Sequence, residues 1–330
     1  MNKFKYFLLA GILLLVACGS SNKNNTVTQV EVDEVKAPEF NADSAYQYVK
    51  KQCDFGPRIP NSKAHENCAD WLENQFKAFG ATVTVQEENL KAWDGNTLKM
   101  RNIIASYKPE SGKRVLICSH WDSRPWADND PDAANHRTPI DGADDGASGV
   151  GVMLELARQF QQKCPEVGVD LICFDLEDYG VAQWYDGQKD ENSWCLGSQY
   201  WSRNPHKAGY NARFGVLLDM VGNKNAVFYQ EYFSMRYAKN VVNRLWNKAE
   251  KMGMGGRFVK KDGGGVTDDH CPINEIAKIP CVDIIPLYPD NESSSFGPVW
   301  HTLNDNISNI DPSTLKQVGQ LLMEVIYNEK

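Results

Sequence analysis

Short apolar runs alternate with amphipathic segments along this chain, and no other feature limits its fold as much. Strand-like runs cover residues 82–86, 100–107, 115–119, 169–174, 214–218 and 282–287. Apolar residues at helical spacing cover residues 42–53, 64–79, 150–160, 235–252 and 315–327. Strands that alternate with helices predict an α/β sandwich in which helices flank a mixed, largely parallel central sheet. No linker interrupts the pattern after Pro38, so we expect a single domain.

The start of the chain differs in composition from the rest. Lys3 and Lys5 precede an apolar run over residues 7–16. This run is too short to span a bilayer and is typical of a secretion signal. The residues Leu15-Val16-Ala17-Cys18 resemble a bacterial lipobox, which implies cleavage before Cys18 and lipid on its sulfur.

These features divide the chain into three parts. We expect a lipoprotein signal peptide over residues 1–17, a lipidated Cys18 with a flexible polar tether to residue 38, and a folded domain over residues 39–330. The mature protein would be exported and lipid-anchored in the bacterial cell envelope, on the periplasmic side or in the outer membrane. We expect a monomer that contacts the membrane through this anchor.

Charge and cysteine content exclude some classes of protein. The formal net charge of -8 argues against nucleic acid as a partner. No Cys-x-x-Cys motif occurs, so a zinc cage made of cysteines is not expected. In an exported protein Cys53 and Cys68 could form a disulfide. Cys118 and Cys173 lie in apolar runs, and we expect them to be buried thiols.

Carboxylates or imidazoles follow nearly every predicted strand. They are His120, Asp122, Glu177, Asp178, Asp219, Asp268, Asp269 and His301, with Asp145 in a glycine-rich loop over residues 141–149. Long loops over residues 123–140, 179–194 and 289–299 are expected to build a site at the carboxyl edge of the sheet. Burying so many acids is costly unless they meet a cation. One or two histidines with several carboxylates suit catalytic zinc better than calcium or magnesium.

Two other motifs do not fit the loop over residues 141–149. An EF-hand loop would need an oxygen ligand where Ala143 stands. A serine nucleophile elbow would need a different spacing of glycines around Ser148.

Five short segments, in this order, resemble a known family. They are His-x-Asp at 120–122, Gly-Ala-Asp-Asp-Gly-Ala-Ser-Gly at 142–149, Phe-Asp-x-Glu-Asp at 174–178, Asp-Met-Val-Gly at 219–222 and Trp-His-Thr at 300–302. Together they resemble the M28 family of zinc-dependent aminopeptidases and glutaminyl cyclases, from Phe55 to the C-terminus. The resemblance implies a zinc aminopeptidase-like catalytic domain and two competing activities.

Some segments are closer to the cyclases of this family. Phe-Gly-Pro-Val-Trp-His-Thr at 296–302 and Asp-Asp-His-Cys-Pro at 268–272 resemble cyclase signatures, and Trp184 matches a tryptophan of the cyclase pocket. One departure concerns the pair Glu177-Asp178, which is Glu-Glu in the animal enzymes. The carboxylate at position 178 is therefore one methylene shorter.

The resemblance implies a role for each matched residue. The ligands of one Zn²⁺ per chain would be Asp145, Asp178 and His301, and Glu177 would be the general base. Asp219 and Asp268 would hold Glu177 and the leaving amide. The walls of the substrate pocket would be formed by Trp184, Trp300 and Phe296, with His270 as a supporting residue. Trp121 and Trp126 would pack in the interior, and His136 and His206 would lie in surface loops.

The reaction implied is glutaminyl-peptide cyclotransfer, which converts the N-terminal Gln of peptides or proteins to pyroglutamate and releases ammonia. One alternative is a dizinc M28 aminopeptidase, because His120, Asp145 and Asp219 allow a second metal by residue type. A more distant alternative is a lipid-anchored binding protein without catalytic activity.

Overall fold

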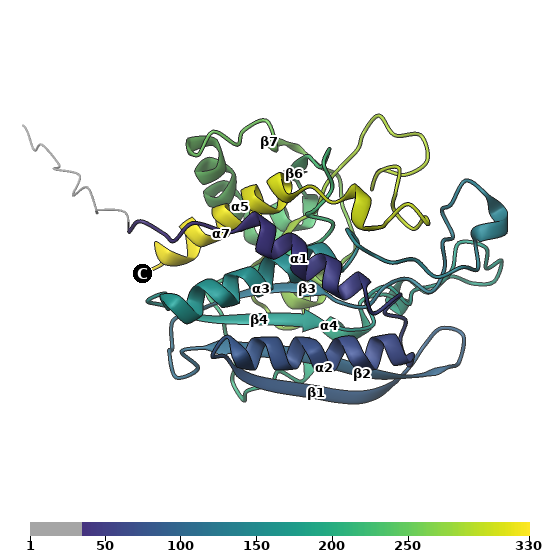
Figure 1. The fold of residues 1–330 in the computed structure, drawn as a ribbon, viewed down its shortest axis with the longest axis horizontal. Coiled ribbons are helices and arrows are strands. Elements are labelled where there is room, and N and C mark those ends of the chain that lie inside the picture. Colours follow the sequence, from purple (N-terminus) through teal and green to yellow (C-terminus); the bar gives the residue numbers. More distant parts are fainter. Residues whose placement is uncertain (1–34) are drawn as a thin grey trace, which may run out of the picture. The chain divides into compact units, whose positions relative to one another are not determined.

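The computed structural model describes residues 35–330, and a six-stranded sheet crosses the centre of this part (Figure 1). The order of the strands is β1-β2-β4-β3-β5-β8. Their bounds are Thr82–Lys91 (β1), Thr97–Tyr107 (β2), Arg114–His120 (β3), Gly168–Phe174 (β4), Gly215–Leu218 (β5) and Cys281–Ile284 (β8). β1, β2 and β4 pair antiparallel, and β4, β3, β5 and β8 pair parallel. The predicted mixed, largely parallel sheet is confirmed.

Helices cover both faces of this sheet. Their bounds are Ala42–Cys53 (α1), Lys63–Ala78 (α2), Ala147–Gln162 (α3), Leu196–Arg203 (α4), Tyr232–Lys251 (α5), His270–Glu275 (α6) and Pro312–Tyr327 (α7). The short strands β6 (Phe228–Gln230) and β7 (Phe258–Asp262) form a separate two-stranded sheet. The sequence pattern did not predict α4, α6, β6 or β7, which are among the shortest elements.

Alternate residues of each central strand enter different cores. Ile117 of β3 belongs to the larger core, which includes side chains of α1, α2, α3, α5 and α7. Its neighbours Leu116 and Cys118 belong to the smaller core, with Trp201 of α4 and Ile273 of α6. Because successive side chains of a strand point to opposite faces, an uninterrupted apolar run is what a strand covered on both faces requires.

Side-chain caps set where several helices begin. Asn41 accepts a hydrogen bond from the backbone N–H of Ser44, which starts α1 at the predicted residue. Asp311 caps α7 in the same way, and Pro312 follows it as the first helical residue. α7 therefore begins before residue 315, where apolar periodicity alone placed its start.

Residues 35–38 were expected to belong to the tether, but they contact the folded domain. The backbone N–H of Val35 donates to Asn328 Oδ1, and Gln320 Nε2 donates to the carbonyl of Pro38. The signal peptide, Cys18 and most of the tether lie outside the described residues. None of the helices within residues 35–330 combines the length and the apolar character needed to cross a membrane.

All eight cysteines of residues 35–330 are free thiols. Cys53 and Cys68, for which a disulfide was considered, are therefore unlinked. Cys118 and Cys173 are buried, as their apolar runs predicted.

The parallel strands bring distant parts of the sequence to one edge of the sheet. β3 ends at His120, β4 ends just before Asp175, and β5 ends just before Asp219. The glycine-rich loop leads into α3, which packs on β3. The carboxyl edge of the sheet is therefore crowded with acidic and imidazole groups.

Candidate active site

Three side chains from different loops converge at this edge. The Nε2 atom of His301 lies 3.1 Å from Asp178 Oδ1 and 3.6 Å from Asp145 Oδ2. All three side chains are buried. One ligand atom of each lies within 4.8 Å of the others, and this is the set that the resemblance to the M28 family implied as zinc ligands.

The oxygens of this set fit a cation. Both carboxylate oxygens of Asp178 and the Oδ2 atom of Asp145 are buried and have no hydrogen-bond partner. Burying unpaired carboxylate oxygens side by side is costly, and a metal ion would satisfy them together. Two carboxylates and one imidazole, with a further coordination position open, are a typical donor set for catalytic zinc.

Asp305 holds the loop that carries Asp145. Its Oδ1 atom accepts a hydrogen bond of 2.7 Å from the backbone N–H of Asp144, and its Oδ2 atom accepts one of 3.1 Å from the N–H of Asp145. Burial raises the pKa of Asp305 to about 7, and the charge of Asp145 contributes to the rise. Asp305, four residues after His301, thus positions a candidate ligand.

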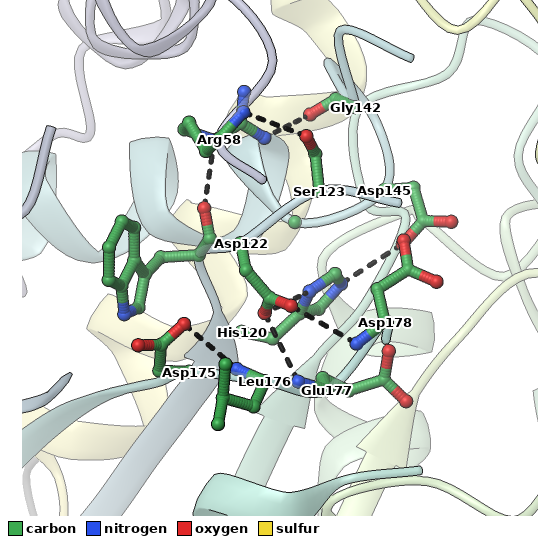
Figure 2. Close-up of polar contacts among 12 residues, drawn as sticks. Arg58, His120, Asp122, Ser123, Gly142, Asp145, Asp175, Leu176, Glu177 and Asp178 are labelled. Carbon is green, nitrogen blue, oxygen red and sulfur yellow. Dashed lines mark hydrogen bonds and ion pairs between the residues drawn. The ribbon is translucent and has the colours of Figure 1, made fainter. Parts of the chain in front are cut away.

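Asp122 holds the segment that carries Asp178. Its two carboxylate oxygens accept hydrogen bonds of 3.2 Å from the backbone N–H groups of Glu177 and Asp178 (Figure 2). The preceding residue, Leu176, has a left-handed backbone with φ of 58°. Such a conformation is uncommon for a side chain of this size and is found where surrounding contacts enforce it, often at active sites.

His301 is oriented by a carboxylate that the sequence pattern did not single out. Its Nδ1 atom lies 3.3 Å from Asp128 Oδ1, so Nε2 is left to face the other two candidate ligands. The guanidinium of Arg124 also donates two hydrogen bonds to the carboxylate of Asp128, at 2.9 and 2.5 Å. Burial opposes ionisation of Asp128, but Arg124 and His301 outweigh it and hold its pKa well below the usual range. Carboxylates in this position fix the tautomer of a metal-binding histidine.

Arg58 joins two loops of the site through their backbone carbonyls (Figure 2). Its side chain is fully buried and donates to the carbonyls of Trp121, Asp141 and Gly142, at 2.8, 2.6 and 2.7 Å. Trp121 precedes Asp122, and Gly142 lies three residues before Asp145. The guanidinium therefore fixes the distance between the loop that carries Asp145 and Asp122, which holds the segment of Asp178.

Arg58→Lys is expected to weaken zinc binding by roughly 10–100-fold, the usual loss when a group that orients metal ligands is removed. Lysine keeps the charge, but it cannot reproduce the rigid fork of donors. Competition with a chromophoric chelator measures the affinity. Arg114→Lys is the matched control, because Arg114 is also buried but bonds Asp170 at the opposite end of β3. Equal losses in both variants would contradict the positioning role of Arg58.

A second cluster of acids lies beside the candidate zinc ligands. Glu177, Asp219 and Asp268 all line the cavity described below. Burial raises the pKa of Glu177 well above its usual value, and Asp178 and Asp268 raise it further, against His120. Burial also raises the pKa of Asp219 to about 8, with Asp268 contributing. The predicted catalytic acids therefore line one cavity, and the charge of Asp268 raises the pKa of both Glu177 and Asp219.

His120 bridges the two clusters. Its Nε2 atom lies 3.0 Å from Asp145 Oδ1 and 3.3 Å from Asp219 Oδ1. Ligand atoms of these three residues lie within 4.8 Å of one another, so they form a second possible metal set. Of the other predicted residues, His270 contacts Glu231 at 3.1 Å and does not line the cavity.

A cavity of about 310 Å³ opens onto these clusters. It is lined by Asp145, Glu177, Asp178, Trp194, Asp219, Met220, Val266, Thr267, Asp268, Ile285, Phe296, Trp300 and His301. The rings of Phe296 and Trp300 pack at 4.8 Å, and Trp300 stacks on the imidazole of His301 at 3.7 Å. Two of the three residues predicted as pocket walls therefore line it.

Trp184, the third predicted wall residue, does not reach the cavity. Its ring packs against Trp93 and Trp126, and the guanidinium of Arg137 lies 3.9 Å from its centre. Trp194 lines the cavity instead, and its ring is nearly parallel to the imidazole of His301, at 6.1 Å and 10°.

Backbone pairing explains why Trp194 reaches the site. The N–H groups of Cys195, Leu196 and Gly197 donate to the carbonyls of residues 177, 176 and 175, at 3.1, 3.0 and 3.0 Å. The end of the long loop is thereby tied to the segment that carries Glu177. A Cβ atom at Gly180 would lie 2.0 Å from the ring of Trp194, so this close approach depends on glycine. The spacing of apolar residues does not indicate that the end of this loop pairs with the segment of Glu177.

Comparisons with known proteins agree with this geometry. The model of peptidase family M28 matches residues 102–326. The structure of Bacteroides thetaiotaomicron glutaminyl cyclase bound to N-acetylhistamine is 56% identical, with a TM-score of 0.88 over 89% of this chain and 100% of that chain. A Zn-dependent exopeptidase from Parabacteroides distasonis is 51% identical, with a TM-score of 0.87 over 89% and 100%. Aminopeptidase YwaD of Bacillus subtilis is 28% identical over 76% of this chain, which spans only 50% of the length of YwaD.

Proposed function

This chain belongs to peptidase family M28, and we propose that it is a zinc-dependent glutaminyl-peptide cyclotransferase. It converts the N-terminal Gln of peptides or proteins to pyroglutamate and releases ammonia. The observation that carries this proposal is Glu177, a partly buried acid that lines the cavity beside the candidate zinc ligands without belonging to their set. Similarity to a bacterial glutaminyl cyclase over the whole length of that chain supports it.

In this proposal Asp145, Asp178 and His301 hold one zinc ion per chain. When bound, zinc supplies Lewis-acid polarisation of the side-chain amide of the substrate. The buried oxygens of Asp145 and Asp178 that have no hydrogen-bond partner support this assignment.

The acidic residues and the aromatic side chains that line the cavity carry out the remaining steps. The α-amine of the substrate attacks the carbon of its own side-chain amide, and the bond from that carbon to the amide nitrogen breaks. Glu177 accepts the proton of the amine and delivers it to the leaving nitrogen, which departs as ammonia. Asp219 and Asp268 hold Glu177 and the leaving amide by hydrogen bonds. Trp300, Phe296 and Trp194 enclose the aliphatic part of the glutamine and exclude water.

A dizinc aminopeptidase is a second candidate, because His120, Asp145 and Asp219 form a second possible metal set. Similarity argues against it, because residues 268–272 and 296–302 resemble cyclase signatures and the chain is 56% identical to a bacterial glutaminyl cyclase.

Parallel assays distinguish the two candidates. The purified protein is incubated with a Gln-peptide, and release of ammonia is measured beside release of the amine from a leucine anilide. A cyclase releases ammonia alone. Amine release without ammonia would establish the aminopeptidase and overturn the proposal.

Cyclisation is expected to weaken as the pH falls below the pKa of the substrate amine, about 7.7–8.0 for an α-amino group in solution. Below that pH the amine is protonated and has no free electron pair for attack, so kcat/KM should decrease about tenfold per pH unit well below the pKa. A peptide whose amine is acetylated serves as the control and should give no product at any pH. A rate that rose toward acidic pH would contradict attack by the neutral amine.

We also propose that the mature protein is a lipid-anchored monomer of the bacterial cell envelope. The lysines, apolar run and lipobox-like ending before Cys18 support this assignment. Cys18→Ser is expected to leave the protein unprocessed or released from membranes. Labelling with a fatty acid checks this directly, and an unlabelled wild type would end the proposal of lipidation.

A further inference from the structure

A thiol lies against the proposed general base. The Sγ atom of Cys195 is 3.2 Å from Glu177 Oε1 and donates to it. Asp268 completes the group, because one donor atom each from Cys195, Glu177 and Asp268 lies within 4.8 Å of the others. The proposed reaction gives no role to the sulfur.

Asp268 brings an unsatisfied oxygen to this group. Its Oδ1 atom accepts a hydrogen bond from the backbone N–H of Asp269, but its Oδ2 atom is buried and has no partner. The residue is only 3% exposed. A buried carboxylate oxygen of this kind needs a donor or a cation.

A cation could reach this group from solvent. Glu177 and Asp268 both line the open cavity, and Cys195 lies directly behind Glu177. The cavity is also lined by Asp145, Asp178 and Asp219. A cleft with so many acids concentrates cations.

The position of the thiol is fixed by the backbone. Cys195 has left-handed backbone angles, φ of 56° and ψ of 34°, which are uncommon for a residue other than glycine. The backbone pairing of residues 195–197 with residues 175–177 holds it in this conformation. The backbone that carries the sulfur is therefore held beside the segment of Glu177.

We propose that Cys195, Glu177 and Asp268 form a second, weaker metal site that takes a thiophilic divalent cation, and that its occupation inhibits the enzyme. Thiolate sulfur favours soft ions such as Cd²⁺ over Mg²⁺ or Ca²⁺. On binding, the thiol gives its proton to solvent and the sulfur becomes a ligand. Glu177 would then also be a ligand and could no longer accept a proton. The binding step rests on geometry alone, whereas the inhibition rests on the proposed role of Glu177.

The test is a cadmium titration of the zinc-loaded protein. Three quantities are followed: the ultraviolet charge-transfer band between thiolate and cadmium, the zinc released, and the residual activity relative to the same variant without cadmium. The wild type is expected to show the band and to lose activity while its zinc stays bound. Cys195→Ser keeps a hydroxyl donor for Glu177 but lacks the soft ligand. It should lose the band and need roughly tenfold or more cadmium for the same fractional inhibition.

Cys164→Ser is the matched control, because Cys164 is an exposed thiol that follows α3 and does not line the cavity. This variant should keep both the band assigned to Cys195 and the inhibition. Unchanged cadmium binding in Cys195→Ser would overturn the proposal, as would release of zinc in proportion to the cadmium bound. Cadmium bound through Cys195 without inhibition would contradict the blocking of Glu177. Because the band and the zinc content are read without substrate, failure of the cyclase assignment would not be mistaken for failure of this site.

Discussion

Glu177→Gln is expected to reduce cyclisation by about 10²–10⁴-fold, the usual contribution of a general acid–base group. The amide cannot accept the proton of the attacking amine, yet it has the size of the carboxylate that it replaces. Zinc content should stay unchanged, because Glu177 does not belong to the set formed by Asp145, Asp178 and His301. Single-turnover rates of ammonia release, with metal analysis of the same sample, measure both effects.

Glu275→Gln provides the control, since Glu275 is an exposed acid at the end of α6 that accepts a hydrogen bond from Tyr237 and does not line the cavity. Its activity should equal that of the wild type. A loss smaller than tenfold in Glu177→Gln would exclude Glu177 as the base, and loss of zinc would move it into the metal set.

Asp178→Ala or His301→Ala is expected to abolish tight zinc binding, because each removes one of three protein ligands. Activity should fall with the metal. A ligand that binds only the folded state also raises its stability, so added zinc should no longer raise the Tm of either variant. Zinc content after dialysis and thermal unfolding with and without zinc measure the two effects.

His136→Ala is the matched control for the histidine. His136 lies in the loop after β3, and its Nε2 atom lies 2.8 Å from the backbone carbonyl of Asp130. This variant should retain zinc. If Asp178→Ala or His301→Ala kept its full zinc after dialysis, the assignment of ligands would be wrong.

The sheet could be predicted because each buried strand is indicated by a short apolar run in its own sequence. A strand covered on both faces needs a largely apolar run, and residues 169–174 and 214–218 are apolar apart from Asp170 and Gly215. Parallel strands bring their carboxyl ends to one edge of the sheet. The sequence alone therefore predicted that His120, Asp178 and Asp219 lie near one another. The short elements β6, β7 and α6 were missed because three to six residues show no period that stands out from a loop.

The loops of the site were predicted less well. Trp184 was assigned to the pocket because it matched a tryptophan of the cyclase pocket, yet its ring packs with Trp93 and Trp126. Trp194 lines the cavity instead, because backbone hydrogen bonds hold the end of this loop against the segment that carries Glu177. Hydrogen bonds between main-chain atoms leave no mark on the side-chain pattern, so this pairing could not be read from the sequence.

The residues that orient the ligands were also missed. Asp128 and Arg124 lie in a loop with several other acids, and nothing in their spacing marks them as partners of His301. Arg58 stands in a Gly-Pro-Arg segment whose contacts go to carbonyls far along the chain. Such roles depend on where three loops meet, and a single sequence does not contain that information.

The measurement that tests the central claim most directly is a zinc titration of the metal-free protein, with ammonia release from a Gln-peptide as the readout. The proposed cyclase has one zinc site, so activity should rise linearly and reach its plateau at about one zinc per chain. The peptide recovered at the plateau should keep its full length and carry pyroglutamate. Activity that continued to rise to two zinc ions per chain, with a peptide shortened by its first residue and no pyroglutamate, would contradict the account and establish a dizinc aminopeptidase.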